Sequence, residues 1–221
     1  MSHNRFFDEH QRETVAAAMG RMIPTDDTPG AREAGSIDFL DQYLSGIEFV
    51  YAKPDGSGFE KLEGKRAWAW EQRIAALRET YVRGIDELDR RSRDGFGTDF
   101  VGLTEEQQDQ VLRDLERPAQ EQEAAVAEEA QVNAPWAPPE PALQQTMTEM
   151  ALEFVPLLAL HTRQGFYADP IYGGNRDRAG WQVIGFPGPA SLADVHTGRY
   201  SVLDYFADRR GYPGTEDERG A

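Results

Sequence analysis

The sequence predicts a mostly α-helical fold: a single helical domain with long ordered loops and an extended acidic, proline-rich arm. In several segments apolar residues recur at intervals of three and four, which is the spacing of one face of an α-helix. Two of these segments begin with a capping box, a side-chain pair that satisfies the first backbone N–H groups of a helix. Between the segments lie loops that contain many of the 21 glycines and 13 prolines of this 221-residue chain. This length suits one domain with a hydrophobic core.

Charge and composition exclude several functional classes. The formal net charge is -16, so nucleic acid and anionic membrane surfaces should repel the chain. The absence of cysteine excludes disulfides, thiolate metal sites and cysteine catalysis. No run of about 18 apolar residues occurs, so we expect no direct membrane insertion. The N-terminus turns acidic where a signal peptide would be apolar, which predicts a cytoplasmic protein, with export only if a leader was removed or a partner carries it.

The first predicted helix begins after Asp8 and ends before Pro24. Asp8 and Gln11 have the spacing of a capping box. Apolar residues then follow at helical spacing: Val15, Ala18, Met19 and Met22. Pro24 opens a loop in which the adjacent Asp26 and Asp27 fit no calcium-binding loop. We interpret them as turn or N-cap residues.

Two further helices are predicted before residue 92. The spacing of the second is set by Ile37, Leu40, Leu44, Ile47 and Tyr51. This pattern breaks at the turn-forming residues 53–58, and Tyr51 and Phe59 on either side of the turn suggest a small hairpin. The third helix has the clearest periodicity, with Trp70, Ile74, Leu77, Tyr81, Ile85 and Leu88 on one face. Such an aromatic stripe is typical of a core rather than of a cofactor site.

The middle of the chain begins with a glycine-rich connector over residues 92–102. Its Gly95-Phe96-Gly97 lacks the preceding strand and the spacing of a phosphate-binding loop. A second capping box, Thr104 with Gln107, then predicts a helix. The apolar residues of that helix that should face inward are Val111, Leu112 and Leu115.

Residues 118–141 form the predicted arm, because their composition shifts to Glu, Ala, Gln and Pro. Prolines at 135, 138, 139 and 141 make the end of the arm extended. The arm is either a solvated linker or a segment that lies on a partner. Trp136 favours the second interpretation, because an isolated tryptophan among prolines is costly to leave in water.

The C-terminal part of the chain, residues 142–212, begins with another helical stripe. Its members are Leu143, Met147, Met150, Phe154, Leu158 and His161. Pro156 should kink this helix. His161, at the apolar edge of the stripe, is interpreted as a satisfied core or interface residue rather than a ligand. Residues 191–212 are sufficient for a short terminal helix, and residues 213–221 form an acidic tail.

The stretch from Gly165 to Gly188 combines several aromatic residues with glycines and prolines. Glycine allows backbone conformations that other residues avoid, and proline fixes its own φ. We therefore predict a tight turn over residues 171–175 that orients the aromatic side chains. The stretch is either a recognition surface or an ordered structural loop, since it contains no nucleophile and no metal-binding cluster.

No catalytic, cofactor-binding or metal-binding residues are predicted. The four histidines, which include His161 and His196, lack the spacing of paired metal ligands. The serines lie outside any nucleophile-elbow pattern. The chain also lacks the strand–GxGxxG–helix unit that binds FAD, so it should bind no FAD alone. Residues 1–117 are expected to be the N-terminal helical part of one domain.

Three blocks of the sequence resemble a known family. They comprise residues 22–35 with residues 37–40; Phe100, Leu103, Gln107 and Leu112; and Thr162, residues 165–167, Pro170, residues 172–175, Gly180, Trp181 and residues 184–188. Together they resemble the small subunit of gluconate 2-dehydrogenase, the subunit 3 family, over roughly residues 6 to 188. Residues 118–141 and the tail beyond Gly188 lie outside the resemblance.

The resemblance implies a noncatalytic partner of a large FAD-dependent oxidoreductase of the glucose-methanol-choline (GMC) type. Such flavoproteins oxidise sugars, glycosides, sugar acids or polyols, and some systems add a cytochrome subunit. The small subunit stabilises and matures the flavoprotein, and FAD is expected in the partner rather than in this chain. One alternative is a chaperone that releases the flavoprotein after assembly. The other is a self-standing enzyme with His161 or His196 as its base.

The aromatic stretch is the predicted interface with the flavoprotein, because aromatic residues are enriched and charges depleted in interface cores. In the rival interpretation the same residues fold inward onto the chain's own helices. The predicted interface residues are Trp136, Phe166, Tyr167, Tyr172, Gly173, Gly174, Asn175, Trp181, Phe186 and Pro187.

Overall fold

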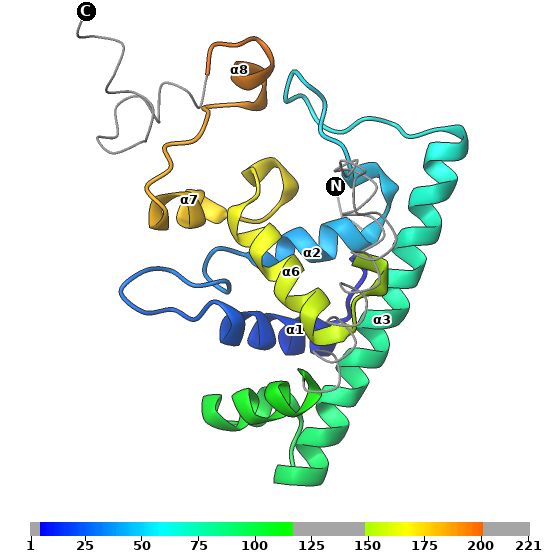
Figure 1. Ribbon diagram of the computed structural model, residues 1–221, viewed down its shortest axis with the longest axis vertical. Helices are drawn as coiled ribbons and strands as arrows, with labels where there is room; N and C mark the ends of the chain where they lie inside the picture. Colours follow the sequence, from blue (N-terminus) through cyan, green and yellow to red (C-terminus); the bar gives the residue numbers. More distant parts are fainter. Residues whose placement is uncertain (1–4, 117–148, 201–221) are drawn as a thin grey trace, which may run out of the picture.

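Helices form almost all of the regular structure in the computed structural model, which describes residues 5–116 and 149–200 (Figure 1). The α-helices are α1 (Glu9–Met22), α2 (Ser36–Ser45), α3 (Gly64–Phe96), α6 (Phe154–Tyr167), α7 (Ala179–Val183), α8 (Leu192–His196) and one over residues 105–116. Short 3-10 turns lie between them: η1 (Ile47–Phe49), η2 (Phe100–Gly102), η3 (Pro170–Tyr172) and η4 (Arg176–Arg178). Within the two described ranges no strand forms, and an isolated bridge joins Ala52 to Phe59. The predicted mostly α-helical fold is confirmed.

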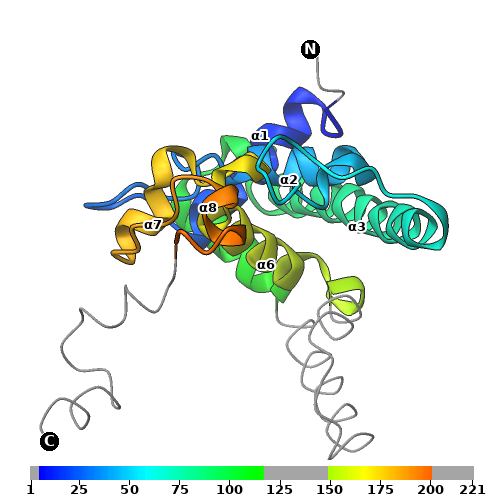
Figure 2. The same ribbon diagram turned by 90° about the horizontal axis from the view of Figure 1, so that it is seen from above.

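The core lies where α1, α2 and α6 pack together beside the middle of α3. Its fully buried side chains come from all four helices: Ala18, Met19, Leu40, Leu44, Leu77, Tyr81, Ile85, Leu88, Leu157 and Leu158. Most of them were predicted by their three- and four-residue spacing. The N-terminal end of α3 extends past the other helices (Figure 2). Trp68, in the second turn of α3, is 64% exposed for this reason.

Two carboxylates fix the segment that enters α1. Asp8 accepts a hydrogen bond from the backbone N–H of Gln11 at 2.8 Å, and the Gln11 side chain accepts one from Asp8, so the predicted capping box is confirmed. Asp41, buried in α2, accepts from the backbone N–H groups of Phe6 and Phe7 and pairs with Arg12. Because a buried carboxylate needs such partners, Asp41 holds the chain entering α1 against α2.

The second helix is shorter than its apolar pattern predicted. The pattern ran to Tyr51, whereas α2 ends at Ser45 and a separate turn, η1, follows Gly46. The cause is Arg78 on α3, whose guanidinium donates to the carbonyls of Leu44 at 2.7 Å and Ser45 at 2.9 Å. These bonds satisfy carbonyls that helix continuation would have used. The suggested small hairpin is present: Ala52 and Phe59 form an antiparallel bridge, the N–H of Lys53 donates to the carbonyl of Gly58 at 2.7 Å, and the N–H of Glu60 donates to that of Tyr51 at 2.8 Å.

The third helix is longer than predicted, and the connector assigned to residues 92–102 is correspondingly shorter. α3 continues to Phe96 and ends at Gly97, whose φ of 81° is left-handed. The Gly97 N–H donates to the carbonyl of Arg93 and closes the last turn. The helix over residues 105–116 begins with the predicted capping box, in which the Gln107 side chain accepts from the N–H of Thr104 at 3.0 Å.

Pro156 does not kink a helix, contrary to the prediction of one bent helix through residue 161. α6 begins at Phe154, so Pro156 occupies its first turn, where its missing N–H would have no intrahelical acceptor. Residues 149–151 are helical but separated from α6 by Leu152 and Glu153. The predicted arm (residues 118–141) with Trp136, and the tail (residues 213–221), lie outside the described residues. Of the predicted terminal helix, α8 is the part that the structure describes.

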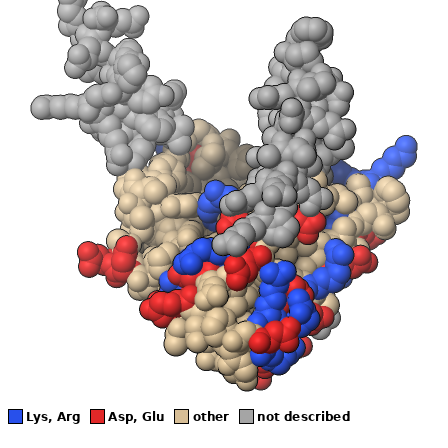
Figure 3. All heavy atoms as spheres, turned by 60° about the horizontal axis from the view of Figure 1, so that its bottom comes forward, with Lys and Arg blue, Asp and Glu red and all other residues tan. Residues whose placement is uncertain are grey.

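Basic and acidic side chains lie interspersed on the face shown in Figure 3. Ion pairs of this mixed kind occur along α3, where Arg90 and Arg91 both pair with Glu87 and Arg90 also pairs with Asp94. The paired arginines lower the pKa of Glu87 to about 2. A surface of mixed sign provides no continuous positive field for a polyanion.

The ion pair between His10 on α1 and Asp89 on α3 should make stability depend on pH. The ring Nε2 lies 2.6 Å from the Asp89 carboxylate, and the hydrogen bond with Asp89 raises the pKa of His10 above its ordinary value of 6.5, helped by the charges of Asp99 and Asp8. A raised folded-state pKa stabilises the fold fully below 6.5, and this stabilisation is lost as pH rises through the folded-state pKa.

We therefore expect His10→Gln to lower the urea midpoint more at pH 5.5 than at pH 8.5. The loss in free energy of unfolding at pH 5.5 should exceed that at pH 8.5 by less than about 1 kcal/mol, because the His10 side chain is half exposed and such pairs are weak. Urea unfolding of both proteins across this pH range measures it, and an equal loss at both pH values would contradict the assignment.

Candidate functional site

Asn175 organises the aromatic, glycine-rich stretch that follows α6. This residue is fully buried and has a left-handed backbone conformation, with a φ of 49°. Its N–H donates to the carbonyl of Gly165 at 2.8 Å, and its side-chain amide donates to the carbonyl of Ala168 at 2.8 Å. Its side-chain oxygen accepts from the N–H of Gly180 at 2.9 Å. One side chain thus joins the end of α6, the turn and the start of α7, as the predicted tight turn requires.

Close backbone approach explains why glycine is needed in the turn. A Cβ on Gly174 would overlap the carbonyl group of Gly165, to which the next residue is hydrogen-bonded. Beyond the turn, Asp177 and Arg178 are both left-handed, with φ of 55° and 58°. Such conformations cost free energy in non-glycine residues and persist only where the surroundings fix them.

The predicted interface residues divide into an inward and an outward group. Phe166, Asn175 and Trp181 are buried against the chain's own atoms, as the rival interpretation of an internal ordered loop expects. The indole N–H of Trp181 donates to the carbonyl of Tyr167 at 2.8 Å. Gly174 is also buried, and Trp136 lies outside the described residues.

The outward group keeps apolar surface in contact with solvent. Tyr167 is 39% exposed, and the adjacent Val183 and Ile184, which the sequence interpretation did not include, are 42% and 50% exposed. Pro187 is exposed, while Tyr172, Gly173 and Phe186 are partly buried. The stretch therefore combines buried residues that pack on the chain's own atoms, and from which we infer a support for its surface, with three exposed side chains. These three, Tyr167, Val183 and Ile184, are called the exposed apolar set.

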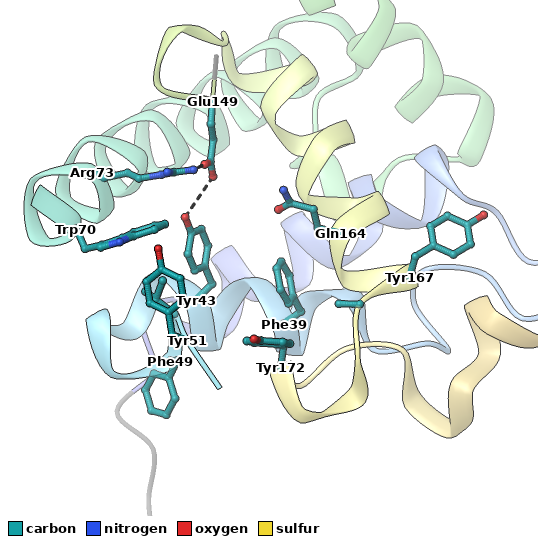
Figure 4. A pocket seen from close by; sticks show the side chains of 12 residues that line it. Phe39, Tyr43, Phe49, Tyr51, Trp70, Arg73, Glu149, Gln164, Tyr167 and Tyr172 are labelled. Carbon is teal, nitrogen blue, oxygen red and sulfur yellow. Dashed lines mark hydrogen bonds and ion pairs between the residues drawn. The ribbon is translucent and has the colours of Figure 1, made fainter. Parts of the chain in front are cut away.

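A pocket of about 630 Å³ lies beside this stretch (Figure 4). Its walls come from α2, the segment after α2, the N-terminal half of α3 and the α6–η3 connection. The lining residues are Phe39, Tyr43, Phe49, Val50, Tyr51, Trp70, Arg73, Glu149, Gln164, Tyr167, Ala168 and Tyr172. The ring of Tyr167 points away from the other aromatic rings in Figure 4. Aromatic side chains of the remaining walls thus enclose a mostly apolar space, to which Arg73 and Glu149 add a charged pair.

Edge-to-face contacts between rings hold the pocket walls together. Tyr43 and Tyr51 each contact Trp70 in this way, at centroid distances of 6.3 and 5.7 Å. Tyr172 contacts Phe59 at 5.7 Å, and its hydroxyl accepts a hydrogen bond from the N–H of Ala52 at 3.3 Å. The aromatic stretch is therefore tied to the wall that follows α2, and the pocket and the stretch form one site.

A buried polar chain leads from the pocket into the core. Glu149 is 3% exposed and pairs with Arg73, whose guanidinium lies 4.5 Å from the centre of the Trp70 ring. The other side of the Glu149 carboxylate lies 2.5 Å from Nε2 of His161. Nδ1 of His161 lies 2.8 Å from the hydroxyl of Tyr81, on the middle of α3. Each member of this chain therefore has a polar partner.

His161 is held as a neutral imidazole. Burial lowers its pKa to about 3, and the positive charge of Arg73 acts in the same direction. A neutral ring that donates from Nε2 to Glu149 must accept at Nδ1, so Tyr81 donates its hydroxyl proton. Both ring nitrogens of the fully buried His161 are therefore satisfied inside the protein. Burial also raises the pKa of Tyr43, beside Glu149, to about 12.

This arrangement bears on the alternative in which a histidine is a catalytic base. His161 is the satisfied core residue that its position predicted, and it has no free nitrogen to accept a proton from a substrate. His196 lies in the last turn of α8, outside the pocket. Over residues 5–116 and 149–200 no cluster of three or more His, Asp or Glu side chains could hold a metal ion.

Comparison with protein families decides the affiliation of the chain. The family model described as gluconate 2-dehydrogenase subunit 3 matches residues 9–188. The chain belongs to this family. The resemblance found in the three sequence blocks is thereby confirmed. Searches of curated proteins and of solved structures gave no match.

The part of this subunit 3 protein that matches the family model contains the complete candidate site. It begins at the start of α1 and ends at Gly188, so the pocket, the buried polar chain and the aromatic stretch all lie within it. α8 follows the matched region. None of the helices in the described part is both long enough and apolar enough to span a membrane.

Sequence analysis missed the charged pair of the pocket. Arg73 follows Trp70 by three positions and precedes Leu77 by four, so it lies on the same face of α3 as these apolar residues. An arginine within an otherwise apolar stripe was a usable signal, because such a residue must be paired when it is buried. Glu149 carried no comparable signal, since it is one of many acidic residues and lies outside any apolar pattern.

Proposed function

We propose that this chain is the noncatalytic small subunit of a heteromeric oxidoreductase, which stabilises and matures a large FAD-dependent subunit of the GMC type. The match to the gluconate 2-dehydrogenase subunit 3 family over residues 9–188 carries the proposal. We propose sugars, glycosides or sugar acids as substrates of the complex and FAD as a cofactor of the large subunit. A cytochrome subunit would accept electrons in some complexes, and we propose that the assembly is cytoplasmic.

The structure supports a binding role in two ways. Among the described residues, the buried histidine has both ring nitrogens occupied, and no strand precedes a helix to form a dinucleotide-binding unit. The exposed apolar set belongs to a stretch whose turn is held by hydrogen bonds of Asn175 and Trp181, and a surface ordered in this way loses little conformational entropy when a partner covers it. We therefore propose that Tyr167, Val183 and Ile184 contact the large subunit.

Purification of a tagged chain from its native host tests the subunit proposal. We expect a flavoprotein to co-purify in a fixed molar ratio, identified by its mass and by flavin absorbance. The complex should reduce a dye acceptor with gluconate or a related sugar acid. A colourless chain that purifies alone would contradict a stable subunit. A flavoprotein that stays active after this chain is removed, and that crosslinks to it only during synthesis, would establish the chaperone alternative.

Substitution of Ile184 by serine should weaken the complex. Ile184 is half exposed and makes a large apolar contribution to the set, so its loss at an interface should raise the Kd about tenfold. The unfolding midpoint of the isolated chain should change little, because the side chain packs against little of its own fold. Val101→Ser is the matched control, since Val101 is 38% exposed on η2. Equal effects of the two substitutions would place the contact elsewhere.

A further inference from the structure

Proline recurs with a period of three in residues 135–141, Pro-Trp-Ala-Pro-Pro-Glu-Pro. The polyproline II helix has three residues per turn. Pro135, Pro138 and Pro141 would therefore share one edge of such a helix, and Trp136 and Pro139 would share the next. Glu140 is the single charged residue in the segment. Two adjacent edges would thus present apolar rings, a pattern suited to an aromatic surface.

The pocket has the chemistry that recognises such a segment. Proline-rich segments bind in grooves lined by aromatic side chains, because their rings pack between aromatic faces and their conformation is already ordered. The pocket offers Tyr43, Tyr51, Trp70 and Tyr172 from four different parts of the fold. Its charged pair, Arg73 with Glu149, is internally neutralised. An uncharged occupant therefore suits it better than an ion.

One buried side-chain nitrogen in the pocket wall lacks a hydrogen-bond acceptor within the described part of the chain. Nε of Arg73 is buried and has no acceptor among the described residues, although the rest of the guanidinium pairs with Glu149. Buried polar groups without a partner are rare. A polyproline II backbone has no internal hydrogen bonds, so all of its carbonyl oxygens are free to accept.

The connection between segment and pocket is short. Glu149 lines the pocket and follows Pro141 by eight positions. Eight residues can span at most about 25 to 30 Å, so Pro141 stays within reach of the pocket. A short tether also raises the effective concentration of the segment at the pocket to the millimolar range.

We infer that residues 135–141 bind in the aromatic pocket of the same chain, with Trp136 and the prolines packed against its rings. Arg66 gives the complex an orientation. Its guanidinium lies 4.5 Å from the centre of the Tyr51 ring, one of the pocket walls, and it is the basic partner for Glu140. This binding requires no second protein and is independent of the proposed subunit function.

A peptide of residues 133–142 tests the inference. In one variant residues 134–141 are replaced by glycine and serine at unchanged length, which leaves every described residue in place. This variant should bind the fluorescent peptide, and the intact chain should bind it at least tenfold more weakly because its own segment competes. Equal binding to both proteins, or no binding to the variant, would overturn the inference. Photocrosslinks from position 136 to the large subunit instead of to Tyr51 or Trp70 would do so too.

A charge exchange locates the peptide in the pocket. In the replacement variant, Arg66→Glu should weaken peptide binding about threefold, which is the size of an exposed ion pair. A peptide with Glu140→Lys should regain this loss on the Arg66→Glu protein. Lys65→Glu is the matched control, because Lys65 is an exposed neighbour on α3 that does not contact the pocket rings. If the two substitutions change peptide binding equally, the assigned orientation is wrong.

Discussion

Replacement of Arg73 by methionine is expected to lower the free energy of unfolding by about 3 to 5 kcal/mol, because it leaves a buried carboxylate without its cation. Arg73 is 7% exposed and Glu149 3% exposed, so water cannot replace the lost partner easily. Methionine fills the space of the arginine stem, although the contact of the guanidinium with the Trp70 ring, whose centre lies 4.5 Å away, is lost. The loss should therefore arise mainly from the uncompensated charge rather than from a cavity.

A double variant separates charge from packing. Glu149→Gln keeps an oxygen that can accept from Nε2 of His161, so Arg73→Met with Glu149→Gln removes both buried charges and keeps that hydrogen bond. The double variant should be more stable than Arg73→Met alone, since a buried pair is often worth little more than a neutral replacement. Urea unfolding measures the free energy of unfolding of all three variants. An unchanged m value shows that they expose the same surface on unfolding and can be compared. Equal losses in the single and double variants would show that packing dominates.

The same substitution should change the pH dependence of stability. In the native protein the folded-state pKa of His161 is lowered from 6.5 to about 3. Below pH 6.5 the unfolded chain therefore binds a proton that the folded chain does not, and stability falls as pH falls. Without Arg73, one of the two causes of the lowered pKa is gone. Folded Arg73→Met should take up a proton more readily, so its deficit relative to the native protein should be smaller at pH 5 than at pH 8.

Local patterns predicted the helices well because helix formation and core burial use the same spacing. In α3 the apolar residues from Ile74 to Leu88 at three- and four-residue intervals face the core, whereas Trp70 at the start of the same stripe lines the pocket. The capping boxes at Asp8 and Thr104 were correct. The errors lie where a distant residue intervened. The C-terminal carbonyls of α2 are capped by Arg78, more than 30 positions away, and no local pattern contains that contact.

The sequence could not predict which aromatic residues of the stretch face inward and which face outward, for a different reason. Aromatic residues are frequent both in cores and in interface centres, so composition alone cannot assign them. The structure assigns Phe166 and Trp181 to the interior, since both support the turn through contacts with their own chain. Ile184 is the most exposed of the large hydrophobic residues in the stretch. It lies next to a glycine and is not aromatic, so the aromatic pattern of the sequence did not indicate it.

The pocket and the core share one polar chain, which connects stability to the site. Tyr81 lies among the fully buried residues, His161 links it to Glu149, and Glu149 lines the pocket. A change at the pocket end therefore reaches the core within three side chains. Substitutions intended to test binding at the pocket should accordingly be made at its rim, as with Arg66, and not at Arg73 or Glu149.

Replacement of Gly180 by alanine is expected to lower the free energy of unfolding by about 3 kcal/mol, at the upper end of the cost of overpacking a core. A Cβ at this position would overlap the backbone carbonyl of Phe166. Backbone cannot move aside as a flexible side chain can, and the N–H of Gly180 is also held by Asn175. The stretch would have to separate from the end of α6, so binding of the large subunit should be lost together with stability.

Gly95→Ala is the matched control for this prediction. Gly95 is exposed near the end of α3, and a Cβ there would meet no atom within 4 Å. Because alanine favours the helix more than glycine does, this variant should be more stable than the native chain by about 0.5 kcal/mol. Thermal and urea unfolding of both variants measure the contrast. A Gly180→Ala protein as stable as the native chain would show that the start of α7 can move away from α6, and that the exposed apolar set lacks the rigid support inferred for it.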